Sequence, residues 1–363
     1  MGQKAVSKFF YCNMIMFTLC LAGVTLAAVF AQYISPSKSF IIPFIGLSLS
    51  FLLIGNILLM LYWILRLRVW FVVPLLAIVC NYQYLERIVH LSSSSGQQLV
   101  NVLKVATFNA DSFGKEWTSV STKEFAYYMS INGVDVLCFQ EFGFGSESFP
   151  IDSIYQAFKK WPYHFVPISP AGHDCLQLAV FSKYPIKDSL LMTFKDTPNC
   201  ALWCDINMNG KMVRLFNLHL QTTNVSSNMT KVKESVKHFD FISGTLYHLF
   251  FMFHDMQESF VMRAEQAEYI HAKIKESPYP VILCGDFNSL PSSYSYRTIL
   301  GNELKDGFCL AGRGYMYTFR YLKHLFRIDY IMTSSHWKAL DYYSPHIDFH
   351  SDHNPVVMTM KMN

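Results

Sequence analysis

Polar side chains able to hold a metal ion or move a proton follow several short apolar runs after residue 100 of the 363-residue chain. The residues concerned are Asn109, Glu141, His219, Asp286, Asn288, Asp329, Asp352 and His353. Their oxygen atoms suit Mg²⁺, Mn²⁺ or Ca²⁺ better than zinc, which prefers cysteine and histidine. Hydrolysis of a phosphoester needs a cation, a positioned water and a proton donor, and histidine can supply the proton near neutral pH. These residue types therefore predict a divalent-metal site beside groups that can move a proton, an assembly that phosphoester hydrolysis could use.

The apolar runs beside these residues have the length of buried β-strands. They cover 102–108, 134–139, 178–181, 213–217, 281–284, 327–332 and 355–360. Helical patterns occur near 121–132, 151–160 and 257–276. Strands and helices alternate without an internal repeat, so we expect an α/β domain whose site forms at strand ends.

Each polar residue also has a purely structural explanation. Asp286-Phe287-Asn288 alone is typical of a turn, because Asp and Asn side chains bond to their own backbone. His219 alone, among apolar residues, is typical of a core histidine. A shared site explains all the polar strand ends together.

Six segments in order carry a family resemblance. They read Ala106-Thr107-Phe108-Asn109, Cys138-Phe139-Gln140-Glu141, Phe216-Asn217-Leu218-His219-Leu220, Cys284-Gly285-Asp286-Phe287-Asn288-Ser289, Arg327-Ile328-Asp329-Tyr330-Ile331 and Ser351-Asp352-His353-Asn354-Pro355. Over residues 101–363 the chain resembles the endonuclease/exonuclease/phosphatase superfamily, which includes deoxyribonucleases, abasic-site endonucleases, inositol polyphosphate 5-phosphatases and neutral sphingomyelinases. The resemblance implies a four-layer αββα sandwich with two mixed sheets. It also implies cleavage of phosphoester bonds with a divalent metal.

The same resemblance implies the ligands of that metal. Glu141 is the expected principal ligand of Mg²⁺, or of Mn²⁺ or Ca²⁺, with Asn109 next to it. Asp329 and Asp352 are expected to complete the metal site or to orient the last histidine.

Catalytic roles are implied in the same way. His353 resembles the catalytic histidine, paired with Asp352. Asp286 is expected to orient or deprotonate the attacking water, and Asn288 to bind the phosphate. His219 matches a second histidine of the deoxyribonuclease and sphingomyelinase members, and is a candidate general acid and substrate ligand.

One segment departs from the family pattern. Gln177 stands where a glycine is common, in the strand before Ser182-Lys183-Tyr184-Pro185-Ile186. The tyrosine and asparagine pair of the abasic-site enzymes is not recognisable there. This departure disfavours a role in DNA repair.

The first part of the chain has the composition of a membrane segment. The whole chain is 52% hydrophobic and 15% charged, against about 25% charged for a soluble domain, and a disordered, collagen-like or small disulfide-rich protein is excluded. Residues 1–100 hold six Lys/Arg and one acid, which leaves 24 basic and 25 acidic residues, a net −1, for 101–363. We expect a membrane region at 1–91 with spans at 9–31, 40–65 and 69–88. A cleaved signal peptide is the alternative for the first span.

Basic residues beside these spans predict the orientation, because short cytoplasmic loops are rich in Lys and Arg. Lys4 and Lys8 precede the first span. Arg66 and Arg68 lie between the second and third spans, whereas only Lys38 lies between the first and second. A cytoplasmic N-terminus and three crossings place the catalytic domain on the extracytoplasmic side. If the third segment does not span, the domain is cytoplasmic.

Two further segments lie outside the catalytic motifs. Residues 92–100 are expected to be a polar linker between the membrane region and the catalytic domain 101–363. The stretch 222–258 contains many aromatic residues. It is expected to form an amphipathic helix on the core or, alternatively, a membrane-facing lip beside the site.

Three functions remain open from the sequence. The first is a membrane-tethered phosphodiesterase for a lipid head group or another small phosphoester, with the bilayer as partner. The second is a membrane-anchored nuclease, and the third is a non-catalytic binding module. Nucleic-acid binding draws on many Lys/Arg–phosphate contacts, so the net −1 of residues 101–363 favours the first. The oligomeric state is left open.

Overall fold

The computed structural model describes residues 3–90, 102–114, 118–143, 150–167, 177–223, 243–320 and 324–363. The predicted linker at 92–100 lies outside the described residues.

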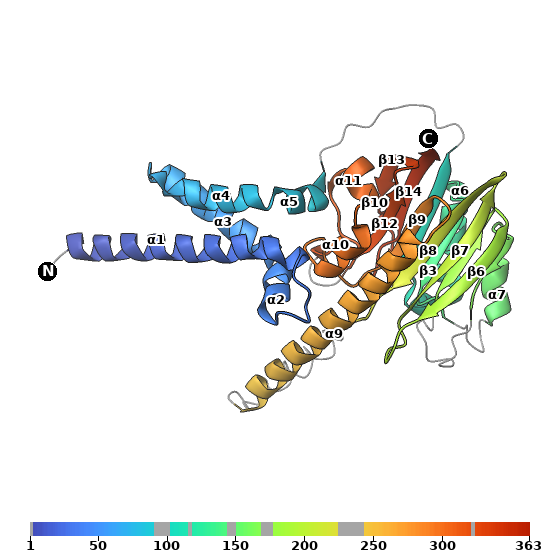
Figure 1. Cartoon of the computed structure of the whole chain (residues 1–363), viewed down its shortest axis with the longest axis horizontal. Helices are drawn as coiled ribbons and strands as arrows, with labels where there is room; N and C mark the ends of the chain where they lie inside the picture. Colours follow the sequence, from blue (N-terminus) through green and yellow to red (C-terminus); the bar gives the residue numbers. More distant parts are fainter. Residues whose placement is uncertain are drawn as a thin grey trace.

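Two six-stranded sheets form the centre of the C-terminal domain (Figure 1). In order, the first contains β13 (Trp337–Tyr343), β14 (Val356–Met362), β2 (Leu103–Asn109), β3 (Val136–Gln140), β5 (Ala179–Ser182) and β4 (Tyr163–Phe165). The second contains β10 (Leu304–Asp306), β12 (Asp329–Ser334), β9 (Val281–Asp286), β8 (Lys211–His219), β7 (Cys200–Met208) and β6 (Ile186–Thr193). Both are mixed, because β2 pairs with β3 and β8 with β9 in parallel while the other neighbours are antiparallel.

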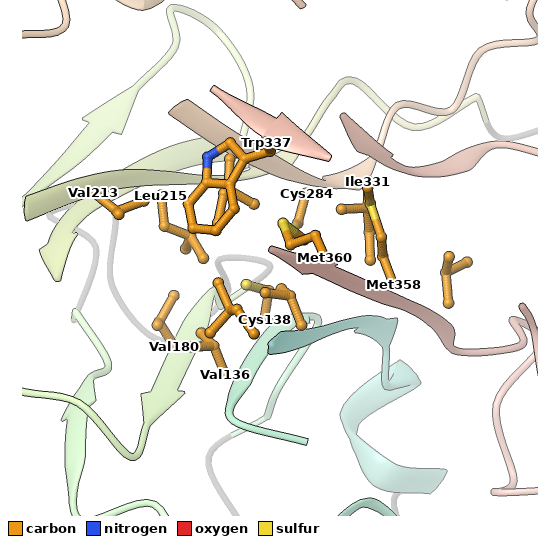
Figure 2. Packing of buried hydrophobic residues seen from close by; sticks show 14 of the residues in the cluster. Val136, Cys138, Val180, Val213, Leu215, Cys284, Ile331, Trp337, Met358 and Met360 are labelled. Atoms are coloured by element: carbon orange, nitrogen blue, oxygen red, sulfur yellow. The ribbon is translucent and has the colours of Figure 1, made fainter. Parts of the chain in front are cut away.

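The two sheets pack face to face through a buried apolar layer. Figure 2 shows side chains from both sheets in this layer: Val136, Cys138, Val180, Val213, Leu215, Cys284, Ile331, Trp337, Met358 and Met360. Strand β2 contacts β9, and β3 contacts β8, across it. Burial of this apolar surface is the main force that holds the sheets together.

Helices cover the outer face of each sheet. Residues of α6 (Thr118–Ile131) and α7 (Ile151–Ala157) pack on the first sheet. Residues of α9 (Ser243–Lys275) and α10 (Tyr294–Leu300) pack on the second. Short helices η3 (Asp111–Gly114) and α11 (Gly307–Ala311) complete the domain. The predicted four-layer αββα sandwich with two mixed sheets is confirmed.

The long helix α9 differs from its predicted extent. The pattern predicted a helix at 257–276, but the helix begins at Ser243. Residues 243–258 of the predicted amphipathic stretch therefore belong to it, whereas 224–242 lie outside the described residues. Its N-terminal half extends beyond the sandwich, on the same side as the N-terminal helices (Figure 1).

The N-terminal helices lie to one side of the sandwich and pack against one another. They are α1 (Gln3–Ala27), η1 (Ala28–Gln32), α2 (Ile41–Leu47), α3 (Leu49–Leu65), η2 (Val69–Phe71), α4 (Val72–Cys80) and α5 (Tyr82–Ile88). Helix α1 contacts α3 and α4, and α3 contacts α4. Within the described residues the segment Val6–Gln32 is long and apolar enough to cross a membrane, and two bent helix pairs bring the number to three if each is one span.

The two later predicted spans are each bent in the structure. The segment predicted at 40–65 bends by 63°, and that at 69–88 by 61°. Ser48 (ψ −1°) and Asn81 (ψ 18°) interrupt the two helices. Asn81 stays buried because its amide donates to the carbonyls of Thr25 and Ala77.

Hydrogen-bonded polar groups lie among the buried side chains of this helical bundle, and many large apolar side chains are exposed on its surface. Asn56 donates to Thr25 Oγ1 over 2.7 Å, and the Trp63 indole donates to Thr18 Oγ1 over 2.9 Å. The exposed side chains include Phe9, Phe10, Met16, Phe17, Phe51, Ile54, Leu58, Leu61, Leu76 and Val79. Polar contacts between helices and an apolar outer surface are typical of helices surrounded by lipid.

The bundle is bonded directly to the sandwich. Ser292 Oγ donates to the Gly46 carbonyl over 2.8 Å, and Arg87 Nη1 donates to the Pro291 carbonyl over 3.1 Å. The strand β1 (Val89–His90), which follows α5, pairs with β11 (Gly314–Tyr315).

Gly285 allows β9 to approach β8, and its replacement tests this packing. Its φ is +143°, and a Cβ there would lie 2.1 Å from the Leu218 carbonyl oxygen. We predict that Gly285→Ala lowers the free energy of unfolding by about 2–4 kcal/mol, measured by urea unfolding of the full chain followed by circular dichroism.

Gly133→Ala is the matched control for this substitution. Gly133 also has a positive φ, +70°, but no atom lies within 4 Å of the added Cβ. It should cost only about 1 kcal/mol of backbone strain. Equal losses for the two variants would show that the approach of β9 to β8 is not tight.

Candidate active site

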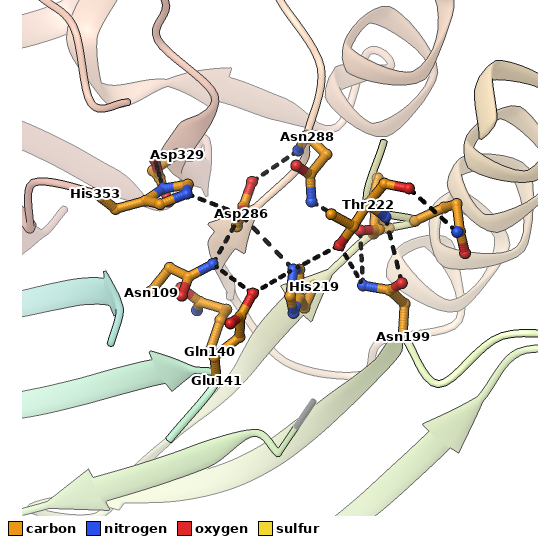
Figure 3. A network of polar contacts seen from close by, with 12 residues as sticks. Asn109, Gln140, Glu141, Asn199, His219, Thr222, Asp286, Asn288, Asp329 and His353 are labelled. Atoms are coloured by element: carbon orange, nitrogen blue, oxygen red, sulfur yellow. Dashed lines mark hydrogen bonds and ion pairs between the residues drawn. The ribbon is translucent and has the colours of Figure 1, made fainter. Parts of the chain in front are cut away.

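The polar residues at the strand ends of both sheets meet in one cluster (Figure 3). Asn109 ends β2 and Glu141 follows β3, in the first sheet. His219 ends β8 and Asp286 ends β9, in the second. Their proximity follows from the packing of β2 on β9 and of β3 on β8.

The buried Asn109 amide joins the two sheets. Its Nδ2 donates to Glu141 Oε1 over 3.2 Å and to Asp286 Oδ2 over 3.1 Å. The carboxylates of Glu141 and Asp286 thus share one amide donor. A cation bound between these two carboxylates would balance their charge. Its Oδ1 accepts from the Asp111 backbone N–H over 3.2 Å.

His353 is held between carboxylates from three directions. Its Nδ1 lies 2.9 Å from Asp329 Oδ2, and both residues are buried. Its Nε2 lies 3.7 Å from Asp286 Oδ2 and 3.7 Å from Asp352 Oδ1. Asp329 is thus the acid that orients the ring, whereas Asp352, with a side chain 33% exposed, lies farther away.

His219 occupies the opposite side of Asp286. Its Nε2 lies 3.7 Å from both Glu141 Oε1 and Asp286 Oδ2, and 3.5 Å from Thr222 Oγ1. The ring is fully buried, and its Nδ1 makes no hydrogen bond within the described residues.

Burial and the neighbouring charges perturb the titration of these groups. Burial raises the pKa of Glu141, of Asp286 and of Asp352, and Asp329 raises the pKa of Asp286 further. Crowded, dehydrated carboxylates of this kind favour a bound cation.

The two histidines differ in charge at neutral pH. Burial lowers the pKa of His219 to about 4, so its ring is neutral. Burial also disfavours the charged form of His353, but Asp329 and Asp286 outweigh it and raise the pKa of His353 to about 10. The cluster therefore contains one neutral imidazole and one imidazolium, an arrangement suited to different steps of proton transfer.

Two site residues have a backbone that non-glycine residues seldom adopt. Glu141 and Asn288 both have φ +47°. The Asn288 backbone N–H donates to Asp286 Oδ1 over 2.8 Å, and its Nδ2 donates to the Leu220 carbonyl over 3.0 Å. Such left-handed residues often occur at functional sites, where surrounding contacts offset the strain.

Further buried polar residues support the site, and the sequence analysis assigned them no role. Gln140 Nε2 donates to Asn217 Oδ1 over 2.6 Å, and Asn217 Nδ2 donates to the Phe139 carbonyl over 2.9 Å. This bridge connects β3 of one sheet with β8 of the other. Gln140 immediately precedes Glu141, and Asn217 lies two residues before His219. Gln140 and Asn217 both lie within the segments that carry the family resemblance, so their positions in those segments could have indicated a role.

Helix α9 fixes the segment after His219. Gln266 Oε1 accepts from the Gln221 N–H over 2.8 Å. The buried Arg263 donates to the Gln221 carbonyl and to Thr223 Oγ1, each over 2.6 Å. No periodicity in the sequence indicated these contacts, because they depend on where α9 lies in space.

All eight predicted site residues thus lie in or beside one cluster. Seven have a side chain in contact with another of the eight, by hydrogen bond or ion pair: Asn109, Glu141, His219, Asp286, Asp329, Asp352 and His353. Asn288 contacts the cluster through its backbone, while its side chain binds the loop after β8.

A protein-family model accounts for this combination of fold and site. Residues 106–353 match the model of the "Endonuclease/Exonuclease/phosphatase family". The chain belongs to this family. Residues 7–88 match a separate model, described as "Domain of unknown function (DUF8431)". The chain matches no curated protein sequence.

Solved structures share the family fold at low sequence identity. The endonuclease/exonuclease/phosphatase from Bacteroides vulgatus has a TM-score of 0.53 and 18% identity, and the match covers 73% of this chain and 100% of that one. D. rerio TDP2 complexed with single strand DNA product has a TM-score of 0.51 and 16% identity, with coverage of 72% and 99%. The likeness shows that the C-terminal domain shares the fold of these proteins.

The family generally uses divalent metals, and the donor atoms of this cluster fit one. Glu141, Asp329 and Asp352 supply carboxylate oxygens, the donors that hard cations prefer. Asn109 would join them through its amide oxygen after rotation of the side chain, because Nδ2 now faces the carboxylates and Oδ1 accepts from the Asp111 N–H. Asp286, Asp329 and His353 offer ligand atoms within 4.8 Å of one another. Asp329 Oδ1 is buried and makes no hydrogen bond in the described part of the chain. A buried oxygen without a partner is suited to bind a cation.

We predict that Asp329→Asn lowers the pKa of His353 from about 10 toward its ordinary 6.5. The measurement is histidine-selective NMR on chelator-treated protein. The ion pair stabilises the fold fully below pH 6.5 and is lost as pH rises toward 10, so the variant should lose that pH dependence as well. Asp188→Asn, at an exposed carboxylate on β6, should leave the titration of His353 unchanged. An unaltered His353 in Asp329→Asn would contradict the assignment of Asp329.

Proposed function

We propose that the chain is a membrane-tethered, divalent-metal-dependent phosphodiesterase. The observation that carries the proposal is the convergence of acidic, amide and histidine side chains from the strand ends of both sheets. The cluster pairs carboxylates that suit a cation with two histidines in different charge states, and it lies in a chain of the endonuclease/exonuclease/phosphatase family.

In the proposed reaction, water attacks the phosphorus atom and the bond to the leaving oxygen breaks. A divalent ion at Glu141 and Asn109, with Asp329 and Asp352 as further acids, would neutralise charge on the phosphate. Asp286 accepts a proton from the attacking water.

The two histidines and Asn288 act on the phosphate and the leaving group. The imidazolium of His353, held by Asp329, donates a proton to the leaving oxygen. His219, which is neutral, and Asn288 donate hydrogen bonds to phosphate oxygens. The positive charge of His353 in the metal-free protein therefore favours it over the neutral His219 as the general acid.

Membrane tethering is proposed from the helical bundle. Its polar groups are bonded internally and its large apolar side chains are exposed. Figure 1 places the N-terminus at the end of α1 far from the sandwich. If α1 and the two bent pairs each cross the bilayer, the N-terminus and the catalytic domain lie on opposite sides. Lys4 and Lys8 then favour an extracytoplasmic catalytic domain.

A lipid head group or another small phosphoester is the proposed substrate class. Tyr247, Phe250, Phe251 and Phe253 are exposed on the N-terminal half of α9, and the rings of Phe253 and Phe44 of α2 lie 5.4 Å apart. The same helix holds the loop beside His219. An aromatic segment at the bilayer would thus present the site to lipid, as expected for the membrane-facing lip.

We predict that Glu141→Gln lowers metal-dependent hydrolysis of bis-p-nitrophenyl phosphate by the full chain in neutral detergent at least about 100-fold. Chelator should abolish the wild-type rate, and Mg²⁺, Mn²⁺ or Ca²⁺ should restore it. Glu124→Gln, at an exposed position on α6, is the matched control and should keep the rate. A chelator-resistant rate, or full activity in Glu141→Gln, would contradict the proposal. An inactive wild type with every metal would favour the binding-module alternative.

We predict that the full chain in nanodiscs hydrolyses a phospholipid or sphingolipid head group faster than it nicks plasmid DNA or RNA. The net −1 of residues 101–363 gives little bulk attraction to nucleic acid. Product release is measured with Mg²⁺ and with chelator, on each substrate in parallel. Rapid chelator-sensitive nicking of plasmid, with inert lipid, would replace the proposed substrate by nucleic acid.

A further inference from the structure

A cavity of about 440 Å³ lies at the junction of the helical bundle and the sandwich. It is lined by residues of α5, α10 and β10 and by the segment after η1. Its volume lies within the roughly 300–1,000 Å³ of small-molecule sites. We propose that this junction cavity binds the phosphate head group of an anionic lipid, separately from the catalytic cluster.

The charges that line the junction cavity favour an anion. Arg87 of α5, Arg297 of α10 and Lys305 of β10 converge on it from three elements, and none forms an ion pair with an acid among the described residues. Of the two lining acids, Asp306 is already paired with the buried Arg327 at 2.7 Å. Glu86 remains, so the lining contains three basic side chains and one acid that forms no ion pair among the described residues. Arg87 Nη1 already donates to Gln32 Oε1 and the Pro291 carbonyl, and Arg297 Nη1 to the Gly301 carbonyl, which leaves their other N–H groups for a ligand. Guanidinium and ammonium groups arranged in this way suit a phosphate.

A smaller adjoining cavity of about 170 Å³ continues the junction cavity into the helical bundle. Both cavities are lined by Tyr33, Tyr82, Gln83 and Arg87. The smaller one is also lined by the polar Gln32, Asn81 and Ser292 and by the apolar Ala28, Val29 and Leu49. A ligand that fills both would carry polar groups beyond its phosphate, as the glycerol and ester groups of a phospholipid do.

The position of the cavity agrees with the proposed membrane tether, on which this inference rests. Tyr33, which is more than half exposed, follows η1 at the end of the first span that faces the sandwich. Tyrosine at the end of a spanning helix commonly marks the head-group region of the bilayer. The cavity would then open at the depth where lipid phosphates lie.

Arg87 also links the junction cavity to the catalytic cluster. Besides its bond to the Pro291 carbonyl, its own carbonyl accepts from Arg327 Nη2 over 2.7 Å. Pro291 lies three residues after Asn288, and Arg327 lies two residues before Asp329. A bound head group would therefore contact the residue that connects the helical bundle to two segments of the site.

The test is calorimetric titration of the full chain in neutral detergent with dihexanoyl phosphatidic acid. We predict that the double variant Arg297→Glu/Lys305→Glu binds it about tenfold more weakly or worse, because two charge-assisted contacts become repulsive. Lys305→Glu alone, at an exposed side chain, should weaken binding while leaving the thermal unfolding midpoint unchanged.

Three comparisons keep the test decisive. Lys338→Glu/Lys361→Glu reverses two exposed cations that face each other on β13 and β14, away from the cavity, and should bind as wild type does. Glycerol 3-phosphate and dihexanoyl phosphatidylcholine should both bind more weakly than phosphatidic acid.

Unchanged affinity in Lys305→Glu and in the double variant would overturn the proposed site. Equal affinity for glycerol 3-phosphate and phosphatidic acid would overturn the assignment of the site to a lipid. The titration measures binding and not turnover, so a failure of the proposed phosphodiesterase would leave it intact.

Discussion

The packing of one sheet on the other is the constraint on which the site depends. Asn109 and Glu141 belong to one sheet and His219 and Asp286 to the other, so neither sheet alone holds a complete set. The apolar layer holds the two sheets together but does not by itself specify how they are aligned, because apolar contacts are not directional. The buried hydrogen bond from Gln140 to Asn217 is directional and fixes the alignment. An unmade bond there would leave buried amides unpaired, at about 1–3 kcal/mol each. The geometry of the site therefore depends directly on the alignment of the two sheets.

The electrostatic state of the cluster follows from that burial. Carboxylates that are crowded and dehydrated have raised pKa values, and the Asn109 amide only partly compensates for them. The same low-dielectric surroundings keep His219 neutral, while Asp329 keeps His353 charged. His219 and His353 thus differ in charge because of the residues that surround each ring.

The sequence predicted the site residues and most buried strands, but it missed β7, although most residues of that strand are buried. Strands β2, β3, β9 and β14 are largely buried and mostly apolar, and they end close to the predicted positions. The edge strand β6 was not predicted, because most of its side chains are partly or fully exposed and give it no apolar run. The roles of Arg263 and Gln266 were also unpredictable, since they depend on the path of α9 past His219. The bend at Asn81 arises in the same way, from a contact with Thr25 in another helix.

The most direct test of a single site shared by the two sheets is calorimetric titration of Mn²⁺ into chelator-treated full chain. The account predicts that Glu141→Gln, which alters the first sheet, and Asp329→Asn, which alters the second, each weaken the same binding event by about tenfold or more. Exposed Glu124→Gln should leave that event unchanged. Wild-type Mn²⁺ affinity in either Glu141→Gln or Asp329→Asn would show that the cation is not held between the sheets, and would contradict the account.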